Sequence, residues 1–373
     1  MLDFCRQHQA GMLDLLRRLV ELESPSDNKP AVDALGRFLE SELVRFGGKV
    51  SFVPQEKSGN HLKAVFAGNS GRPILLLGHL DTVWPLDTLG SMPFRVEGAR
   101  AFGPGIYDMK AGIVMIIFAL RALAAARAEH PPVLVLLDSD EEIGSPTGRP
   151  LVEATAKECQ AVLVLEPSQG PVGHLKTARK GVGDYRVRVR GRASHAGVDF
   201  EKGRSAIVEL ARQILEVTRF TDISRGITVN PGVIHGGTRS NVVPAEAWVE
   251  VDIRIARAAD AQELEHKFQR LKPFDPDCSL EVTGGLNRPP MERTEGTARL
   301  FHLAKELGGR LGMMLDEAST GGGSDGNFTS ALDIPTLDGL GAVGEGAHAV
   351  DESIVVEELP RRTALLACLI QSL

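Results

Sequence analysis

Residues 132–138 have the sequence PVLVLLD, which is a short and almost wholly apolar run. Two similar runs are PILLLG at 73–78 and AVLVLE at 161–166. Runs of this length and composition are typical of central strands in a sheet that is covered on both faces. The segment 111–128, AGIVMIIFALRALAAARA, is too long for a strand and predicts a helix between the first two runs along the chain. This alternation of strand and helix favours a doubly wound α/β sheet.

Further regular elements are expected towards both ends of the chain. The spacing of apolar residues predicts helices over 9–23, 29–46, 295–312 and 355–372. The segment IPTLDGL at 334–340 predicts one more buried strand. The sheet is therefore expected to combine segments from both halves of the sequence.

The character of the sequence changes near residue 180. GDYRVRVR at 183–190 alternates polar and apolar residues, which is typical of an antiparallel strand with one exposed face. The segments that follow predict helices at 203–219 and 260–271 and strands at 226–235, 246–256 and 278–283. This order predicts a smaller βαββαβ domain that interrupts the larger one.

Length and charge limit the class of protein. A chain of 373 residues is long enough for two or three domains. Lys plus Arg is 42 and Asp plus Glu is 49, so the net charge of −7 gives no basic surface for nucleic acid or an anionic membrane. No run of about 18 apolar residues and no signal pattern at the first residues is apparent, so we expect a cytoplasmic protein. The four scattered cysteines are expected to be reduced core residues.

The strand ends carry residues that bind metals. Ligands of open α/β sheets bind outside the carboxyl ends of the strands. The predicted buried strands lead to His79 and Asp81, to Glu141 and Glu142, to Glu166, and to the glycine-rich loop that holds His348. A further carboxylate, Asp108, lies in the glycine-rich turn before the helix at 111–128.

The spacing of these residues suggests separate roles. Residues two apart on an extended chain share a side, so Asp81 can accept the second imidazole N–H of His79 and present the other ring nitrogen to a metal. Consecutive extended residues face opposite ways, so one of Glu141 and Glu142 can bind metal while the other faces the cavity as a base. A carboxylate in a glycine-rich turn before a long helix, as at Asp108, can bridge two metals.

Each of these residues also has an ordinary structural explanation. His79 can be a satisfied strand-end histidine, Asp108 a helix N-cap, and His348 a loop histidine. Glu141 and Glu142 can belong to a solvated acidic loop, and Glu166 can be an ordinary exposed glutamate. The glycine spacing at 103–112 also suggests a dinucleotide loop, but no Gly-x-Gly-x-x-Gly occurs there.

Taken together, two histidines and three carboxylates form a ligand set that suits two zinc ions, with cobalt or manganese as substitutes. One bridging carboxylate, with one histidine and one further carboxylate for each metal, leaves positions open for water. That arrangement is typical of a hydrolase.

These motifs resemble the di-zinc aminoacylase and carboxypeptidase family, and its glutamate carboxypeptidase branch in particular. The matching segments are GHLDTVWP (78–85), GPGIYDMKAG (103–112), DSDEEIGS (138–145), LEPS (165–168), RASHAG (192–197), SNVVPAEAWVEVDIR (240–254), GGGSDGN (321–327) and GEGAHAVDE (344–352). The resemblance implies a catalytic domain with a doubly wound mixed sheet, over 1–179 and 288–373, and an inserted α+β lid and dimerisation domain over 180–287.

The resemblance also assigns roles to the residues of the motifs. It implies that one zinc is held by His79, Asp108 and Glu166, and the other by Asp108, Glu142 and His348. Asp81 orients His79, and Glu141 is the general base for the attacking water. His195 reaches the partner subunit's active site across a homodimer and polarises the scissile carbonyl.

The remaining motifs are expected to contact substrate. The resemblance implies that Asn241 and Arg254 bind it, with Arg254 pairing a carboxylate, and that Arg288 binds a second carboxylate. Gly322 and Gly323 are expected to lie against the substrate backbone. His174 stands where the glutamate carboxypeptidase branch has a lysine near the substrate.

The function implied is that of a zinc-dependent exo-metallopeptidase that cleaves the amide bond to a C-terminal amino acid, with glutamate as the first candidate. Its substrate is a small molecule or peptide with a free carboxylate. The main alternative is an N-acyl-amino-acid or carbamate amidohydrolase with the same metals and a different pocket. Two more distant alternatives are a metal-stabilised binding protein without activity and a nucleotide-binding oxidoreductase.

Overall fold

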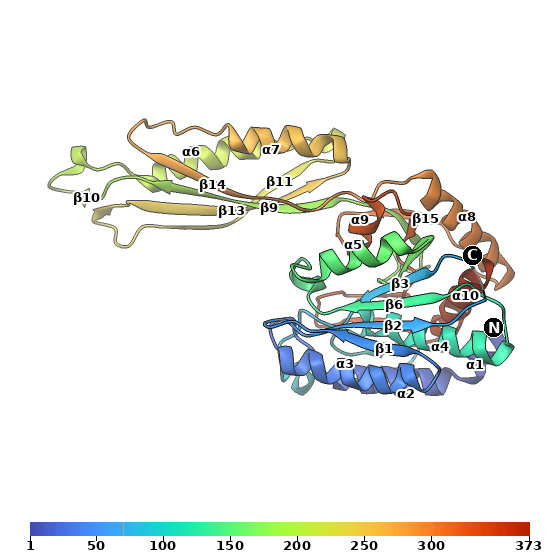
Figure 1. The fold of residues 1–373 in the computed structure, drawn as a ribbon. Coiled ribbons are helices and arrows are strands. Elements are labelled where there is room, and N and C mark those ends of the chain that lie inside the picture. Colours follow the sequence, from blue (N-terminus) through green and yellow to red (C-terminus); the bar gives the residue numbers. More distant parts are fainter. Residues whose placement is uncertain (70) are drawn as a thin grey trace. The chain divides into compact units, whose positions relative to one another are not determined.

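The computed structural model describes residues 1–69 and 71–373. Packing divides the chain into two units, which Figure 1 shows. Unit 1 comprises Met1–Ala178, Arg293–Thr320 and Ser324–Leu373, and unit 2 comprises Arg179–Glu292 and Gly321–Gly323. The division of the chain into domains at 1–179, 180–287 and 288–373, with the roles given above, stays a prediction.

Unit 1 is built around a six-stranded sheet with the strand order β1-β2-β6-β3-β7-β16. Its strands are β1 (Lys49–Val53), β2 (His61–Phe66), β3 (Ile74–His79), β6 (Val133–Asp138), β7 (Ala161–Val164) and β16 (Thr336–Leu337). The pairs among β6, β3, β7 and β16 are parallel, whereas β1 and β2 pair antiparallel at one edge. The mixed α/β sheet predicted from the sequence is therefore confirmed, with two additional strands, β1 at the edge and β2 next to it, that were not predicted.

Helices cover both faces of this sheet, as the uninterrupted apolar runs require. Ile74 and Leu76 of β3 lie in one core, and Leu75 and Leu77 lie in another, because successive side chains of a strand point to opposite faces. The first core includes α1 (Leu2–Gln7), α2 (Gln9–Glu21), α3 (Lys29–Val44), α4 (Ala111–Ala126), α8 (Glu295–Arg310) and α10 (Glu358–Ser372). The second includes α5 (Gly148–Glu158) and α9 (Gly326–Ser330).

Two smaller sheets complete unit 1, and the sequence did not predict them. One has the order β17-β18-β5-β4 and is antiparallel. Its strands are β4 (Arg95–Glu97), β5 (Arg100–Phe102), β17 (Gly344–Glu345) and β18 (Ser353–Val355). The pairing of β18 with β5 brings the loop that holds His348 to the loop that holds Asp108. The other sheet joins β8 (Leu175–Arg179) to β15 (Glu317–Thr320).

Unit 2 contains a four-stranded antiparallel sheet with the order β11-β13-β9-β14. Its elements are β9 (Gly181–Arg190), α6 (Ala206–Thr218), β11 (Thr228–Gly236), β13 (Glu246–Ile255), α7 (Ala261–Gln269) and β14 (Ser279–Arg288). This is the βαββαβ order expected from the sequence. A separate two-stranded antiparallel sheet joins β10 (Ser194–His195) to β12 (Val242–Val243). Figure 1 shows α6 and α7 on one face of the sheet, where Tyr185 stacks on Phe268 with ring centroids 3.8 Å apart.

The helical segment Ile106–Ala126 is long and apolar enough to cross a membrane by length and composition alone, and 78% of its most apolar window is buried inside the protein. Burial of this extent is typical of a core helix, since α4 packs against α2 and α10. That the chain has no membrane-spanning segment stays a prediction.

Candidate metal centre

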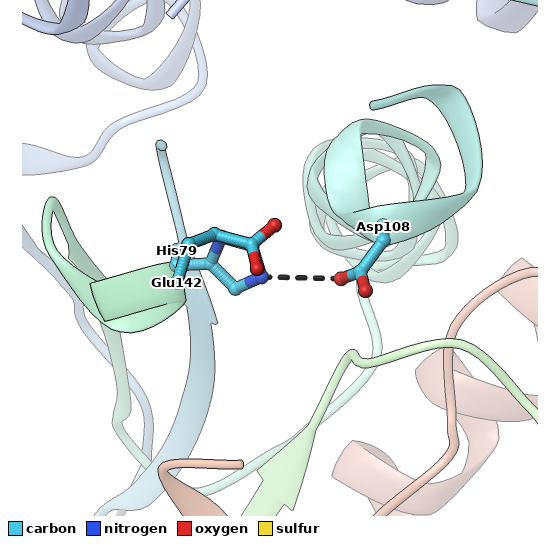
Figure 2. Close-up of side chains that lie close together, drawn as sticks. All are labelled: His79, Asp108 and Glu142. Carbon is cyan, nitrogen blue, oxygen red and sulfur yellow. Dashed lines mark hydrogen bonds and ion pairs between the residues drawn. The ribbon is translucent and has the colours of Figure 1, made fainter. Parts of the chain in front are cut away.

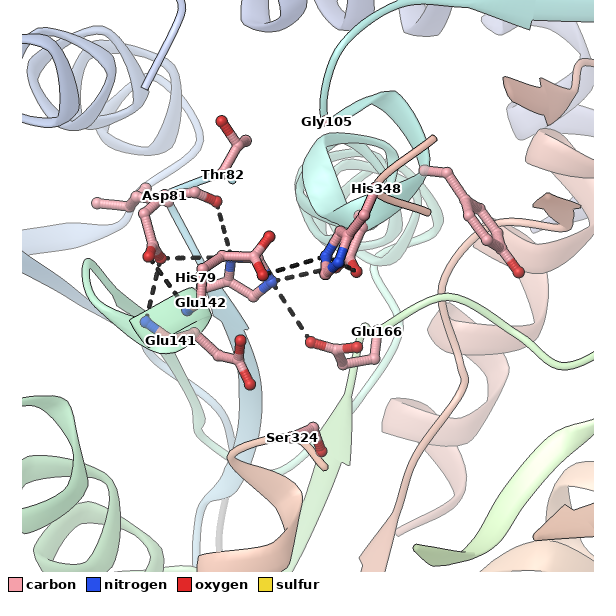
Figure 3. Close-up of polar contacts among 12 residues, drawn as sticks. His79, Asp81, Thr82, Gly105, Glu141, Glu142, Glu166, Ser324 and His348 are labelled. Carbon is pink, nitrogen blue, oxygen red and sulfur yellow. Dashed lines mark hydrogen bonds and ion pairs between the residues drawn. The ribbon is translucent and has the colours of Figure 1, made fainter. Parts of the chain in front are cut away.

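The carboxyl end of β3 places His79 at the middle of a cluster of acidic side chains (Figure 3). The imidazole is buried, and its Nε2 lies 3.2 Å from Oδ1 of Asp108 and 3.4 Å from Oε1 of Glu166. Glu166 follows β7, which is the parallel neighbour of β3 in the sheet. Adjacent parallel strands therefore bring His79 and Glu166 together, as the strand-end argument expected.

The carboxylate of Asp108 lies between two histidines. Its Oδ1 is 3.2 Å from Nε2 of His79, and its Oδ2 is 3.5 Å from Nε2 of His348. The same nitrogen of His348 is 3.2 Å from Oε2 of Glu142. Figure 2 shows Asp108 facing His79 and Glu142. One carboxylate is thus shared by two groups of donors, each with one histidine and one glutamate.

Asp81 holds several parts of this cluster in place. Its carboxylate accepts hydrogen bonds from Oγ of Ser26 at 2.6 Å and from the main-chain N–H groups of Glu141 and Glu142 at 3.2 Å each. Nδ1 of His79 lies 2.9 Å from the main-chain carbonyl of Asp81 and 3.4 Å from its carboxylate. The carbonyl is therefore the nearer acceptor for the imidazole, and the carboxylate mainly fixes the turn that carries the two glutamates.

Glu141 and Glu142 are not in extended chain, contrary to the expectation. They begin a short 3-10 helix, Glu141–Ile143, because Asp81 accepts from consecutive N–H groups and the chain turns after β6. The two side chains still separate. Glu142 groups with His79 and Asp108, whereas Glu141 groups with His79 and Glu166, and the potential ligand atoms of each group lie within 4.8 Å of one another.

The charges at the centre are strongly coupled. Burial disfavours a protonated His79, but the carboxylates of Asp108, Asp81 and Glu166 outweigh it and raise the pKa of the imidazole well above its usual value. Asp108 and Glu142 likewise hold the pKa of His348 at about 10. Burial raises the pKa of Glu142 to about 7, although His348 opposes this shift. A bound cation stabilises a cluster of this kind, because it favours ionised carboxylates and neutral imidazoles.

The donors fit divalent metal ions. Two imidazoles and several carboxylates are the ligands that zinc and similar ions use in hydrolytic sites. Oε1 of Glu142 is buried and has no hydrogen-bond partner among residues 1–69 and 71–373. A buried carboxylate oxygen without a partner costs free energy unless a cation approaches it. We therefore regard the cluster as fitted to metal.

Glu352 is a residue of this site that the sequence did not single out. Its buried carboxylate accepts from the indole N–H of Trp84 at 2.8 Å and from the main-chain N–H groups of Gly105, Tyr107 and Asp108 at 2.9–3.0 Å. It lies four residues after His348, so one side chain ties the loops of both residues together. Its only sequence signal is its place at the end of the segment 344–352.

The other predicted residues belong to unit 2 and are described within it. Nδ1 of the exposed His195 accepts from the N–H of Gly197 at 3.1 Å, so the neutral ring carries its proton on Nε2. Asn241 is exposed, and its main-chain carbonyl accepts from the N–H of Ala196 at 3.0 Å.

The predicted substrate-binding arginines and glycines, Arg254, Arg288, Gly322 and Gly323, contact other residues of unit 2. The guanidinium of Arg254 donates to the carboxylate of Asp252 at 2.8–3.1 Å. Arg288 is buried, and a Cβ added to Gly323 would come within 2.9 Å of its side chain. The carbonyls of Gly322 and Gly323 accept from Arg179. Packing within unit 2 thus accounts for the glycine at 323, and the substrate roles of these residues stay predictions.

Comparison with known proteins places the chain among metallopeptidases. The model of Peptidase family M20/M25/M40 matches residues 75–372. Carboxypeptidase G2 of Pseudomonas sp. (strain RS-16) is 33% identical over 380 residues, which is 98% of this chain and 90% of that protein. Succinyl-diaminopimelate desuccinylase of Stenotrophomonas maltophilia (strain R551-3) is 31% identical over 323 residues, which is 81% of this chain and 84% of that protein.

The fold agrees with solved structures. A dinuclear metal-binding peptidase of the M20 family from Bacillus subtilis superposes with a TM-score of 0.72 at 18% identity, over 98% of each chain. At this identity the likeness concerns the fold alone.

Proposed function

Because the chain belongs to peptidase family M20/M25/M40, we propose that it is a carboxypeptidase-type hydrolase that cleaves the amide bond to a C-terminal amino acid. The observation that carries the proposal is the carboxylate of Asp108, which lies between His79 and His348 with one glutamate beside each histidine. Likeness to carboxypeptidase G2 over almost the whole chain supports glutamate as the first amino acid to test.

Two divalent cations are the proposed cofactors, with zinc first and cobalt or manganese as substitutes. His79 and Glu166 would hold one, Glu142 and His348 the other, and Asp108 both. Bound there, the cations act as Lewis acids on the scissile carbonyl and make water a stronger nucleophile at neutral pH.

Glu141 is the proposed general base. Its main-chain N–H donates to Asp81, which fixes the turn, and its carboxylate lies beside His79 and Glu166. From this position it takes a proton from the attacking water and delivers it to the leaving nitrogen. His195 is proposed to donate from Nε2 to the developing oxyanion in the partner subunit of a homodimer, because Gly197 leaves the proton on that nitrogen.

Substrate binding is assigned to residues of unit 2. We propose that Arg254, Arg288 and Asn241 bind the carboxylate side of the substrate, and that the loop of Gly322 and Gly323 lies along its backbone.

A homodimer through 180–287 has support from exposed apolar side chains of α6, such as Leu215, and sedimentation of the purified protein tests it. Four free cysteines support a reducing compartment, which we propose is the cytoplasm.

The adjacent pair Glu141 and Glu142 provides the test of the mechanism. Glu141→Gln is expected to lower kcat by about 10²–10⁴-fold, because proton transfer is lost, while metal content stays near that of the unaltered protein. Glu142→Gln removes a proposed ligand and is expected to lower metal content as well. Metal analysis and steady-state kinetics on N-acyl-glutamates measure both. Near-normal turnover of Glu141→Gln contradicts its assignment as the base.

The second candidate is an N-acyl-amino-acid amidohydrolase, and the likeness to a succinyl-diaminopimelate desuccinylase favours it. The same metals and base serve both reactions, so the two differ only in the acyl group and the amino acid. A panel of N-acyl and peptidyl substrates separates them. Protein that binds metal yet cleaves no amide in this panel contradicts both.

A further inference from the structure

A chain of hydrogen bonds within unit 1 ends on Asp140, the residue that precedes the proposed base Glu141. It begins at His61, the first residue of β2, and passes through Thr147, which lies at the start of α5. The side chains of His61 and Asp140 are fully buried. None of these three residues is a proposed metal ligand, so the chain has a separate explanation.

The hydrogen bonds of His61 fix the position of its proton. The main-chain N–H of Ser139 donates to Nδ1 of His61 at 3.2 Å, and the hydroxyl of Ser139 gives its proton to the carbonyl of Gly59. Nδ1 is therefore an acceptor, and the neutral imidazole carries its proton on Nε2. Burial lowers the pKa of His61, although nearby carboxylates oppose this shift, so the neutral ring agrees with its surroundings.

The hydroxyl of Thr147 continues the chain in one direction. Its Oγ1 lies 3.0 Å from Nε2 of His61, 2.5 Å from Oδ2 of Asp140 and 3.2 Å from Oγ of Ser58. A carboxylate only accepts, so the hydroxyl proton goes to Asp140, and the two lone pairs of Oγ1 accept from His61 and Ser58. The hydroxyl thus makes all the hydrogen bonds of which it is capable, and its orientation is fixed.

The chain holds Asp140, and through it the main chain of Glu141. Besides the hydroxyl of Thr147, the carboxylate of Asp140 accepts from the N–H groups of Thr147 and Gly148 at 2.9 and 3.1 Å. The N–H of the next residue, Glu141, donates to the carboxylate of Asp81 at 3.2 Å. The main chain of the proposed base is therefore anchored on one side by Asp81 and on the other by Asp140.

We propose that His61 and Thr147 are positioning residues for the proposed general base, and that they act on Glu141 through Asp140. The inference rests on the proposed function, in which Glu141 takes a proton from the attacking water. A base has to lie within hydrogen-bond reach of that water, and a displacement of about 1 Å can cost about 10²-fold in rate.

Thr147 provides the test, because valine keeps its shape and serine keeps its hydroxyl. For zinc-loaded protein and N-benzoyl-L-glutamate, Thr147→Val is expected to lower kcat by about 10–100-fold. Its KM and metal content are expected to stay near those of the unaltered protein, because neither side chain of the chain's first two residues donates to a proposed ligand among the described residues. Thr147→Ser is expected to retain kcat.

Thr363→Val is the matched control. Thr363 is buried in α10, and its hydroxyl donates to the carbonyl of Leu359 at 2.7 Å. This variant loses a buried hydroxyl and a hydrogen bond that does not belong to the chain, so kcat is expected to stay unchanged.

A double-mutant cycle shows whether the effect passes through Glu141. In the Glu141→Gln background, Thr147→Val is expected to change kcat by less than about twofold, because the base that it positions is already absent. A general loss of structure would instead lower kcat by the same factor in both backgrounds.

His61 gives an independent pair of variants, which serves if Thr147→Val fails to fold. The side-chain amide of His61→Gln can donate to Thr147 in place of Nε2, whereas His61→Leu has no donor. The leucine variant is therefore expected to have a kcat about tenfold or more below that of the glutamine variant.

Hydrogen exchange of the metal-free protein gives a readout that needs no activity. In Thr147→Val, amide exchange in peptides that cover residues 139–148 is expected to be about tenfold or more faster, because the turn loses a hydrogen bond to a charged group. Thr147→Ser and Thr363→Val are expected to exchange like the unaltered protein. Mass spectrometry of the peptides measures these rates.

The outcomes separate the two proposals. Unchanged kcat in Thr147→Val and His61→Leu overturns the inference and leaves the proposed function standing, as does a loss of kcat that is equally large in the Glu141→Gln background. If the unaltered protein cleaves no amide of the panel, the proposed function is overturned and hydrogen exchange decides on the chain. Faster exchange that serine prevents then supports its hold on Glu141, and unchanged exchange overturns it.

Discussion

At the scale of single residues, Glu352 holds the proposed metal ligand Asp108 in position, although Glu352 is not itself a proposed ligand. The main-chain N–H of Asp108 is fixed by Glu352, and the side chain of Asp108 is then free to face both histidines. Residues that orient ligands in this way commonly affect metal affinity by about 10–100-fold. Glu352 therefore acts as a positioning residue for the proposed centre.

Glu352→Gln is expected to weaken metal binding by about 10–100-fold, because an amide nitrogen cannot accept from the N–H groups that face it. Competition with a chelator measures the affinity, and thermal unfolding of the metal-free variant measures the structural cost separately. Glu345→Gln is the matched control in the same loop, where the exposed Glu345 pairs only with Arg100 among described residues. Wild-type affinity in Glu352→Gln contradicts the positioning role.

The difference between Glu352 and the predicted residues explains what a single sequence can reveal. His79 and Glu166 were identified because each follows an apolar run, so the strand itself marks their position. Glu352 accepts from main-chain groups that are distant in sequence, and a glycine-rich loop contains no periodic pattern that marks an acceptor. Only the folded chain shows that these groups meet.

At the scale of elements, the start of α4 depends on a close approach to the sheet. A Cβ added to Gly112 would lie 2.2 Å from the main-chain oxygen of Leu165, which precedes Glu166. This contact lets the helix approach the strand end that carries the proposed ligand. By contrast, a Cβ added to Gly309 of α8 meets no atom of the described residues within 4 Å.

These two helical glycines are expected to respond oppositely to alanine. Gly112→Ala overpacks the interior and is expected to lower the free energy of unfolding by about 1–3 kcal/mol. Gly309→Ala is expected to raise it by about 0.5–1 kcal/mol, because alanine is the better helix former and finds open space. Denaturant titration of both variants tests this. A Gly112→Ala variant at least as stable as the unaltered protein contradicts the packing argument.

Helices and strands are likewise predicted from the sequence only where their residues form a clear pattern. The strands β3, β6 and β7 were predicted because they are buried on both faces and wholly apolar. The edge strand β1 and its neighbour β2 expose part of their residues, so their sequences KVSFV and HLKAVF mix polar and apolar side chains without a clear period. The strands of the β17-β18-β5-β4 sheet have two or three residues each, which is too short for any periodicity.

At the scale of the whole molecule, folding buries three of the four cysteine thiols. All four cysteines are free, and Cys5, Cys159 and Cys278 are buried. Burial raises the pKa of Cys5 and of Cys159 to about 11, from a usual value of 9.0. The neutral thiol is therefore the form that the folded state favours, as expected for cysteines that serve as core residues.

Native protein is expected to react slowly with iodoacetamide at pH 8, because the thiolate is the reactive form, and to react at all four cysteines once unfolded in guanidinium. Because the folded pKa values of Cys5 and Cys159 exceed the unfolded ones, their stabilising effect is complete below pH 9 and is lost as the pH rises through about 11. Mass spectrometry counts the modified thiols. Rapid modification of buried cysteines in folded protein at pH 8 contradicts this account.

The discontinuity of unit 1 has a consequence for biosynthesis. Ribosomes make the chain from its N-terminus, and domains generally fold in that order. Unit 1 needs β16, β18 and α10, and these elements follow unit 2 along the chain, as does His348. Unit 2 is translated in full before those segments exist. A nascent chain therefore carries an incomplete set of the proposed metal ligands until these later segments have been made, so the proposed centre is completed only after unit 2.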